Sequence, residues 1–175
     1  MRQWVDALLR WEVPLFFIVL LRLVVGVELI AQGYSKVQDG YVQQVREKEE
    51  RPNPLQVTIE IWVDDMQERN VFPWYRIFLK EAVLPNINTF AVLVTVAEIA
   101  LGAMLVLGLL VRVASVFGIL LCLNYLFATW HEGFPYPTLN ILFLATLLVF
   151  VLVSAGRCLG VDALLHKRFP EIPLL

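Results

Sequence analysis

Residues 87–130 are INTFAVLVTVAEIALGAMLVLGLLVRVASVFGILLCLNYLFATW, and this stretch decides the fold. Its 44 residues include two charged side chains, Glu98 and Arg112. A transmembrane helix needs about 20 predominantly apolar residues, so the stretch is long enough for two spans, at 87–110 and 113–130, with a tight turn between them. Because lipid offers the backbone no hydrogen-bond partners, both spans are predicted to be helical.

Two further stretches have the same character, at 13–31 and 139–155, so four spans are predicted in all. The 175 residues are 59% hydrophobic and 17% charged, against about 45–50% and about 25% in soluble proteins. We therefore expect an all-α fold, an integral membrane four-helix bundle that forms a single membrane domain over residues 1–175. Arg22 and Glu28 interrupt the first apolar stretch and no cleavage site follows it, so we interpret it as a retained span rather than a signal peptide.

Composition also excludes several classes of protein. The formal net charge of −2 does not fit a basic nucleic-acid binder, so no nucleic-acid partner is expected. The chain has two cysteines, Cys122 and Cys158, in no CxxC motif, so neither a disulfide scaffold nor a zinc site is predicted. His131 and His166 fall on opposite sides of the membrane and no dinucleotide-binding motif occurs, so we predict no haem, flavin or metal in this chain.

The positive charges of the short connections predict the orientation. Cytoplasmic loops carry an excess of Lys and Arg, whereas the loop HEGFPYP at 131–137 has none. We therefore place both termini and the turn at Arg112 in the cytoplasm, in a prokaryotic cytoplasmic membrane, with residues 39–86 and 131–137 outside. The positive residues that decide this orientation are Arg2, Arg10, Arg112, Arg157, Lys167 and Arg168.

The insert 39–86 between the first two spans is the polar part of the protein. Its run REKEER at 46–51 is predicted to be a solvated helix face or turn. The alternating LQVTIEIWV at 55–63 predicts a short strand or extended segment. From Pro73 to about Leu84 we expect a helix on the outer membrane surface, with Trp74 and Tyr75 at headgroup depth.

A short cytoplasmic helix is predicted at 162–169. Asp162 is expected to act as its N-cap, and Pro170 ends it. Lys167 and Arg168 would meet anionic headgroups while its apolar residues touch the membrane.

Two charged residues lie deep in the predicted spans, Arg22 in the first and Glu98 in the second. A lone charge at the bilayer centre costs at least about 2.5–3.5 kcal/mol, so we predict that Arg22 and Glu98 form an ion pair. Their helix faces carry small residues that favour close approach, including Gly26, Gly33 and Gly102. Two interpretations stay open: the pair only fixes helix register, or it also contacts a bound polar headgroup.

Four landmarks together resemble the DoxX family of four-helix membrane proteins. The landmarks are LRLVVGVELIAQGYSKV at 21–37, AEIALGAMLVLGLLVRVAS at 97–115, NYLFATWHEGFPYPTLN at 124–140 and SAGRCLGVD at 154–162. The insert segment WYRIFLKEAVLPN at 74–86 is similar to the DoxD branch in particular, which is the membrane subunit of thiosulfate:quinone oxidoreductase. The resemblance covers about residues 21–165 and implies a quinone-linked membrane subunit.

Two classes of function are weighed on this basis. In the first, the bundle binds quinone and passes electrons from a sulfur compound or a partner subunit. In the second, it is a non-catalytic anchoring or scaffolding subunit of a larger membrane complex. Both expect contact with the lipid bilayer and with other membrane or extracytoplasmic subunits, or a homo-oligomer. A solute carrier is disfavoured because four unbroken spans leave little room for an aqueous path.

A quinone site is expected in the outer half of the bundle. Proton-accepting and hydrogen-bonding groups suit two-electron quinone chemistry, and ionisable residues within a span usually face a bundle interior or a cavity. Glu98 and His131 are the candidate catalytic residues. The candidate quinone-binding residues are Arg22, Glu28, Asn124, Trp130 and Tyr136. A metal at His131 with Glu132 and Glu28 is disfavoured against a solvated loop histidine.

Overall fold

In the computed structural model, the described residues are 15–41, 53–69, 71–153, 155–157 and 160–168. Within them the chain is helical and contains no strand. Four helical stretches in this part of the chain are long and apolar enough to cross a membrane, and the chain is an integral membrane protein, as predicted. These stretches are Phe17–Gln38, Pro73–Leu107, Val111–Glu132 and Tyr136–Val153.

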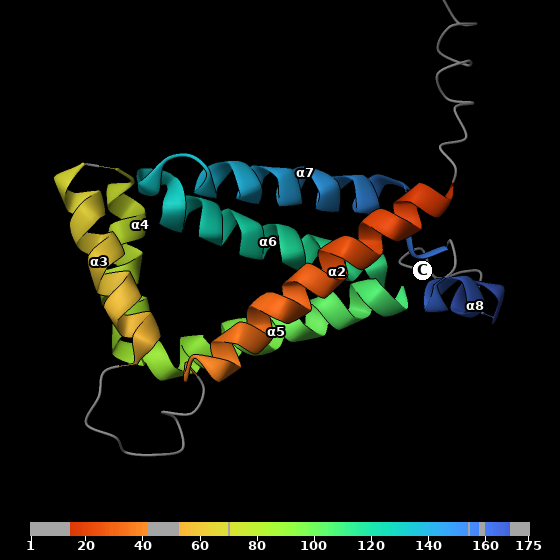
Figure 1. Ribbon diagram of the computed structural model, residues 1–175, viewed down its shortest axis with the longest axis horizontal. Helices are drawn as coiled ribbons and strands as arrows, with labels where there is room; N and C mark the ends of the chain where they lie inside the picture. The colour runs from red at the N-terminus through yellow and green to blue at the C-terminus, as the bar shows by residue number, and fades with distance from the viewer. Residues whose placement is uncertain (1–14, 42–52, 70, 154, 158–159, 169–175) are drawn as a thin grey trace, which may run out of the picture.

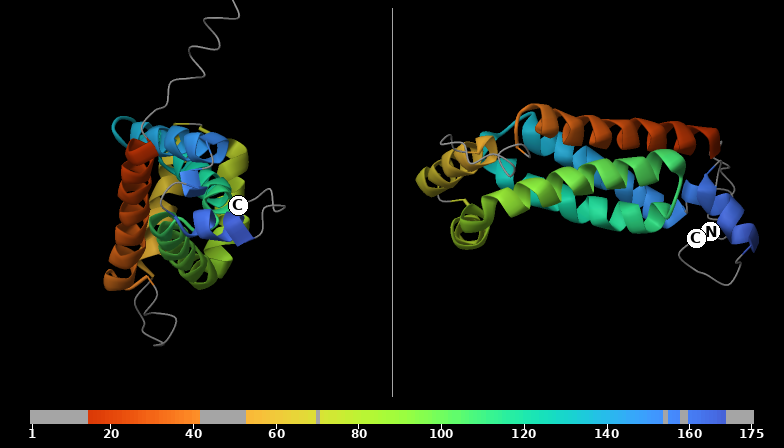
Figure 2. Two further views of the ribbon diagram at one scale, coloured as in Figure 1. Left: turned by 90° about the vertical axis from the view of Figure 1, so that its right-hand side faces the viewer. Right: turned by 90° about the horizontal axis from the view of Figure 1, so that it is seen from below.

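The bundle has the outline of a wedge (Figure 1). Helix α2 (Leu15–Gln38) packs along α5 (Ile87–Leu107), and α6 (Val111–Thr129) packs along α7 (Tyr136–Val153). The two pairs meet near α8 (Val161–Arg168), which we call the narrow end, and spread apart toward α3 (Pro54–Glu68) and α4 (Pro73–Phe78), the wide end (Figures 1 and 2).

Glycines set the register between α2 and α5. A Cβ atom added to Gly102 would lie 2.6 Å from the carbonyl oxygen of Gly26, and one on Gly33 would lie 2.6 Å from the Ile99 side chain. The two backbones therefore approach more closely than larger side chains would permit, as is typical of helices packed in a membrane. This contact fixes which residues of α2 face which residues of α5.

The first span extends further toward the wide end than the sequence indicated. We predicted its end at Ala31, but α2 continues to Gln38 and includes Lys36. The polar residues Gln32, Ser35 and Lys36 led to the shorter prediction, because each lowers the local hydropathy. They belong to the last two turns of α2, and this end of α2 lies near the base of α3 at the wide end (Figure 1).

The prediction of a strand at residues 55–63 is wrong, because this segment belongs to α3. Asn53 caps the helix by accepting a hydrogen bond from the Leu55 amide at 2.9 Å, and Pro54 occupies its first turn, where proline fits well. The buried side chains are Ile59, Val63 and Met66, a helical spacing hidden within the alternating pattern.

After α3 the chain enters the helix predicted from Pro73. It runs through α4, a π-helical turn at Leu79–Val83 and a 3₁₀ turn at Leu84–Asn86 into α5. Trp74 is exposed, as expected for a side chain at the membrane surface. Tyr75 is only 3% exposed and packs among apolar side chains of α3 and α6, so it does not face lipid. The run 46–51 lies outside the described residues.

At the narrow end, α8 closes the turn between α5 and α6. The carboxylate of Asp162 accepts hydrogen bonds from the backbone amides of Leu110 (2.6 Å) and Val111 (3.0 Å). Asp162 therefore caps α6, and the prediction that it is the N-cap of its own helix is wrong. A carboxylate at this position satisfies two amides that the first turn of α6 leaves without partners, and it complements the helix dipole.

Candidate functional site

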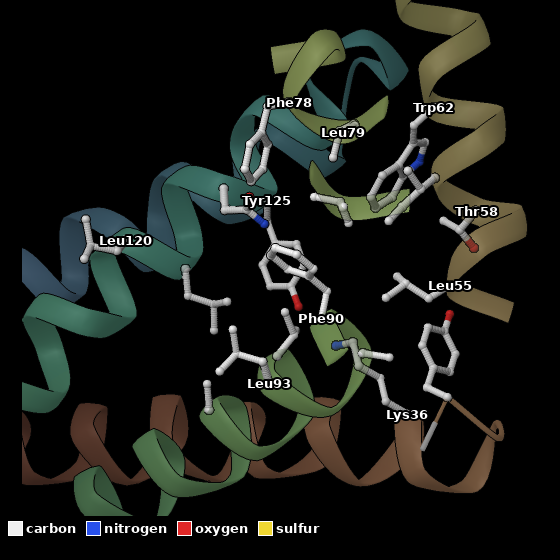
Figure 3. A pocket seen from close by; sticks show the side chains of 18 of the residues that line it. Lys36, Leu55, Thr58, Trp62, Phe78, Leu79, Phe90, Leu93, Leu120 and Tyr125 are labelled. Atoms are coloured by element: carbon white, nitrogen blue, oxygen red, sulfur yellow. The ribbon is translucent and has the colours of Figure 1, made fainter. Parts of the chain in front are cut away.

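A cavity of about 430 Å³ occupies the wide end of the wedge, within the range of about 300–1,000 Å³ that is common for small-molecule sites. Figure 3 shows how its walls are built: Leu55 and Trp62 come from α3, Phe90 from α5 and Tyr125 from α6, and Lys36 reaches in from the end of α2. Most of the lining is aliphatic or aromatic. Apolar walls with a few polar groups are typical of sites that bind small organic molecules.

Lys36 and Tyr125 give the cavity wall a polar part, and with the Glu98 carboxylate behind the wall they form a polar cluster. The Lys36 ammonium lies 2.6 Å and 2.7 Å from the two carboxylate oxygens of Glu98, and the Tyr125 hydroxyl donates to the same carboxylate at 2.5 Å. The Glu98 side chain is fully buried, whereas the Lys36 side chain keeps 19% exposure and lines the cavity. The ammonium also lies 5.4 Å from the centre of the Tyr125 ring. Three helices thus converge on one buried carboxylate.

This cluster can donate hydrogen bonds to a ligand. An ammonium group has three N–H donors, and the two bonds to Glu98 use two of them. Asn124 also borders the cavity; its side-chain oxygen accepts from the Tyr75 hydroxyl at 3.0 Å, and its amide nitrogen donates to no other described residue. A carbonyl or phenolic oxygen placed between Lys36 and Asn124 would find donors there.

The predicted ion pair of Arg22 and Glu98 is wrong. Arg22 is 1% exposed and lies at the narrow end, where its Nη1 donates to the carbonyl of Ala155 at 2.9 Å and passes close to Gly108. Gly108 and Glu98 are ten residues apart in sequence, about 15 Å along a helix. The Gly26–Gly102 contact sets this offset, so Glu98 pairs with Lys36 and Arg22 does not reach the cavity.

Three other residues predicted to bind quinone also do not line this cavity. Glu28 is exposed on the outer surface of α2, with Gln32 3.5 Å from its carboxylate. Trp130 and Tyr136 are 48% and 53% exposed and lie beyond the end of α6. Of the predicted quinone-binding residues, the structure brings Asn124 to the cavity. Glu98, a candidate catalytic residue, is buried directly behind the cavity wall.

His131 is buried, which contradicts the interpretation as a solvated loop histidine. It is 3% exposed, its Nε2 lies 3.6 Å from the Asp65 carboxylate, and its carbonyl accepts from Arg69 at 2.7 Å. These contacts join α3 to the loop before α7 but do not reach the cavity, so the geometry does not bring His131 together with Glu98. Among the described residues, no group of three or more His, Cys, Asp and Glu side chains could hold a metal ion.

The sequence did contain a signal for Lys36. It continues the stripe of Arg22, Gly26, Leu29 and Gly33 by one further turn, and that stripe faces the one that carries Glu98. Tyr125 gave no comparable signal, since an aromatic residue in a span is ordinary. Its role as a hydrogen-bond donor to Glu98 depends on the position of α6 next to α5, which the sequence does not show.

The arrangement defines a helical membrane protein with a cavity between its spans. The DoxX family model matches residues 17–131, and the chain belongs to that family. The match includes α2, α5 and α6 and therefore all three members of the polar cluster. Neither the curated proteins nor the solved structures offer a match to this chain.

Proposed function

We propose that this DoxX-family protein is the membrane subunit of a quinone-linked oxidoreductase complex, and that the wide-end cavity binds the quinone ring. The Lys36–Glu98–Tyr125 cluster beside an apolar cavity carries this proposal. A quinone ring is flat and apolar with two carbonyl oxygens, so it matches aromatic walls with hydrogen-bond donors at one end.

The cluster also suits the proton chemistry of quinones. Reduction of a quinone to a quinol consumes two electrons and two protons. Lys36 would donate a hydrogen bond to a ring oxygen, and Glu98 would accept a proton and return it through the Lys36 ammonium or the Tyr125 hydroxyl. The electrons would come from a sulfur compound or a partner subunit, since we predict no redox cofactor in this chain.

The proposed type of oxidoreductase is based on the insert at residues 39–86. Its similarity to the DoxD branch lies in residues 74–86, and Tyr75, Phe78, Leu79 and Val83 of this segment line the cavity. On that basis we propose thiosulfate as the electron donor and a thiosulfate:quinone oxidoreductase type of complex. The wide end would face outside the cytoplasm and the narrow end inside, in a prokaryotic cytoplasmic membrane.

Two variants test the quinone site. Tyr125→Phe removes one hydroxyl, and the double variant Lys36→Met/Glu98→Leu removes the polar cluster without leaving an unpaired buried charge. Tyr34→Phe is the matched control, because Tyr34 is 57% exposed on α2 outside the cavity. Binding of decylubiquinone to the protein in lipid nanodiscs is followed by quenching of tryptophan fluorescence, since Trp62 lines the cavity.

We expect Tyr125→Phe to weaken binding about fivefold, as loss of one hydrogen bond of about 1 kcal/mol predicts. The double variant should lose binding, and Tyr34→Phe should bind like the wild type. In membranes that hold the whole complex, thiosulfate-dependent quinol formation should fall in the same order. If Tyr125→Phe and the double variant both keep full turnover in a complex shown to contain quinone, the chain is instead a non-catalytic anchoring or scaffolding subunit.

A further inference from the structure

We infer that the wide-end cavity takes its quinone from the bilayer, through an opening between α5 and α6, and that the ligand is a quinone with a long apolar tail. The inference rests on the proposed function and adds the substrate class and the route of entry. The opening is bordered by Leu93 of α5 and by Phe117 and Leu120 of α6, which we call the portal residues.

The portal residues belong to the cavity and to the outer surface at the same time. All three line the cavity, yet Leu93, Phe117 and Leu120 are 61%, 56% and 57% exposed. Side chains that line a cavity and are more than half exposed are expected at the rim of an opening to the outside. Because these positions lie within spans, the surface there faces hydrocarbon.

The opposite wall of the cavity is more deeply buried than the portal residues. Helix α3 forms that wall, and Leu93 and Leu120 lie on the side away from it (Figure 3). The side chains of Ile59 (α3), Leu79 and Val83 are 3–5% exposed and belong to one apolar cluster. Trp62 donates to Glu132 at 2.7 Å, and Tyr75 donates to Asn124, so side-chain hydrogen bonds also tie α3 and α4 to the bundle.

The cavity is therefore polar at one end and apolar at the other. Lys36 stands at the base of α3, and the portal residues offer only carbon atoms to a ligand. The gradient matches a molecule whose ring oxygens bind at Lys36 while its tail passes between Leu93 and Leu120 into lipid. A quinone without a tail would leave the apolar half of the cavity unfilled.

Photochemical crosslinking can locate the tail. The probe is a ubiquinone analogue with an alkyl diazirine at the start of its tail, applied to the wild-type protein in nanodiscs with and without excess decylubiquinone. We expect crosslinks on residues of α5 and α6 at the portal, and we expect decylubiquinone to suppress them. Tandem mass spectrometry of the digested protein identifies the labelled residues.

Variants that narrow the portal provide a second, independent measurement. Leu93→Trp and Leu120→Trp should each reduce labelling about tenfold, which corresponds to about 1.4 kcal/mol of binding free energy. Val96→Trp is the matched control, because Val96 is 57% exposed on α5, one turn from Leu93, and does not line the cavity. It should label like the wild type.

The outcomes separate the two proposals. Competable crosslinks that fall on α3 or near Tyr41 would overturn the membrane route and leave the quinone site standing. Equal labelling of the Leu93→Trp and Val96→Trp proteins would also overturn the route. If no crosslink is suppressed by decylubiquinone, the proposed quinone site itself fails, and the route fails with it.

Discussion

Arg22 and Glu98 are charged side chains buried at opposite ends of the wedge, and the two ends use them differently. At the narrow end, Arg22 donates to the backbone carbonyl of Ala155, next to the turn that joins α5 and α6. At the wide end, Glu98 is held by the side chains of Lys36 and Tyr125, which border a cavity. A buried charge in a membrane protein does not by itself mark a ligand site. The cavity beside it does.

The largest effect should come from separating the wide-end pair. Lys36→Met leaves the buried Glu98 carboxylate without its counter-charge, and we expect a loss of about 3–5 kcal/mol in the free energy of unfolding. Adding Glu98→Leu should recover most of that loss, because the unpaired charge is then removed. Unfolding in mixed micelles with increasing SDS, followed by circular dichroism, measures both variants.

A second pair of substitutions serves as the control for Lys36→Met and Glu98→Leu. Arg22→Met and Glu98→Leu change opposite ends of the bundle, so their effects should add within about 0.5 kcal/mol. Strong coupling between Arg22 and Glu98, together with additivity of Lys36 and Glu98, would reverse the assignment of the two charges.

The next largest loss of stability is expected when the register between α2 and α5 is disturbed. Gly102→Ala places a methyl group 2.6 Å from the Gly26 carbonyl oxygen, so α2 and α5 must move apart, at a cost of about 1–3 kcal/mol. Gly118→Ala is the control, since its Cβ would meet the flexible end of Leu147 at 3.0 Å. The same SDS unfolding compares them. A larger loss for Gly118→Ala would show that the glycine contact does not control the packing.

A smaller loss is expected when the narrow end loses its cap. Asp162→Ala removes the acceptor for the amides of Leu110 and Val111 and should cost about 1–2 kcal/mol, as for other helix caps. Asp162→Asn keeps one oxygen acceptor and should cost less. Neither variant should change decylubiquinone binding. A change in binding would mean that the two ends are not independent.

The orientation of the protein in the membrane can be tested by cysteine labelling, and we expect these substitutions to leave stability unchanged. Single cysteines at positions 49 and 167, in a protein whose two native cysteines are replaced, should react oppositely with a membrane-impermeant maleimide on intact cells. We expect labelling at position 49 and protection at position 167, because the positive charges of the short connections favour the cytoplasm. Labelling of position 167 from outside would place the wide end in the cytoplasm.

The spans were predictable because hydrophobic length is a local property of the sequence. Each of 87–110, 113–130 and 139–155 is close to the helix that the structure contains there. The insert was less predictable. Residues 55–63 satisfy an alternating pattern and a helical one, and only the packing of Ile59, Val63 and Met66 against α4 and the π-helical turn that follows it decides between them.

The sequence predicted the buried carboxylate of the site but not its partner, because the partner depends on how two helices are offset. Burial of a carboxylate at Glu98 and the need for a cationic partner followed from the sequence. The choice between Arg22 and Lys36 depended on the offset of two antiparallel helices, which the close contact of Gly26 and Gly102 determines. The predicted pair of Arg22 and Glu98 assumed that the start of the first span and the end of the second lie at the same depth in the membrane.

Because Asp162 caps α6 from a later part of the chain, the narrow end can be completed only late in synthesis. Asp162 is synthesised after α5, α6 and α7, in a chain that grows at about 5–20 residues per second. Until then the amides of Leu110 and Val111 must find water or headgroups as partners. The two pairs of spans can therefore enter the membrane with the turn between them still loose, and the narrow end is locked only when α8 arrives.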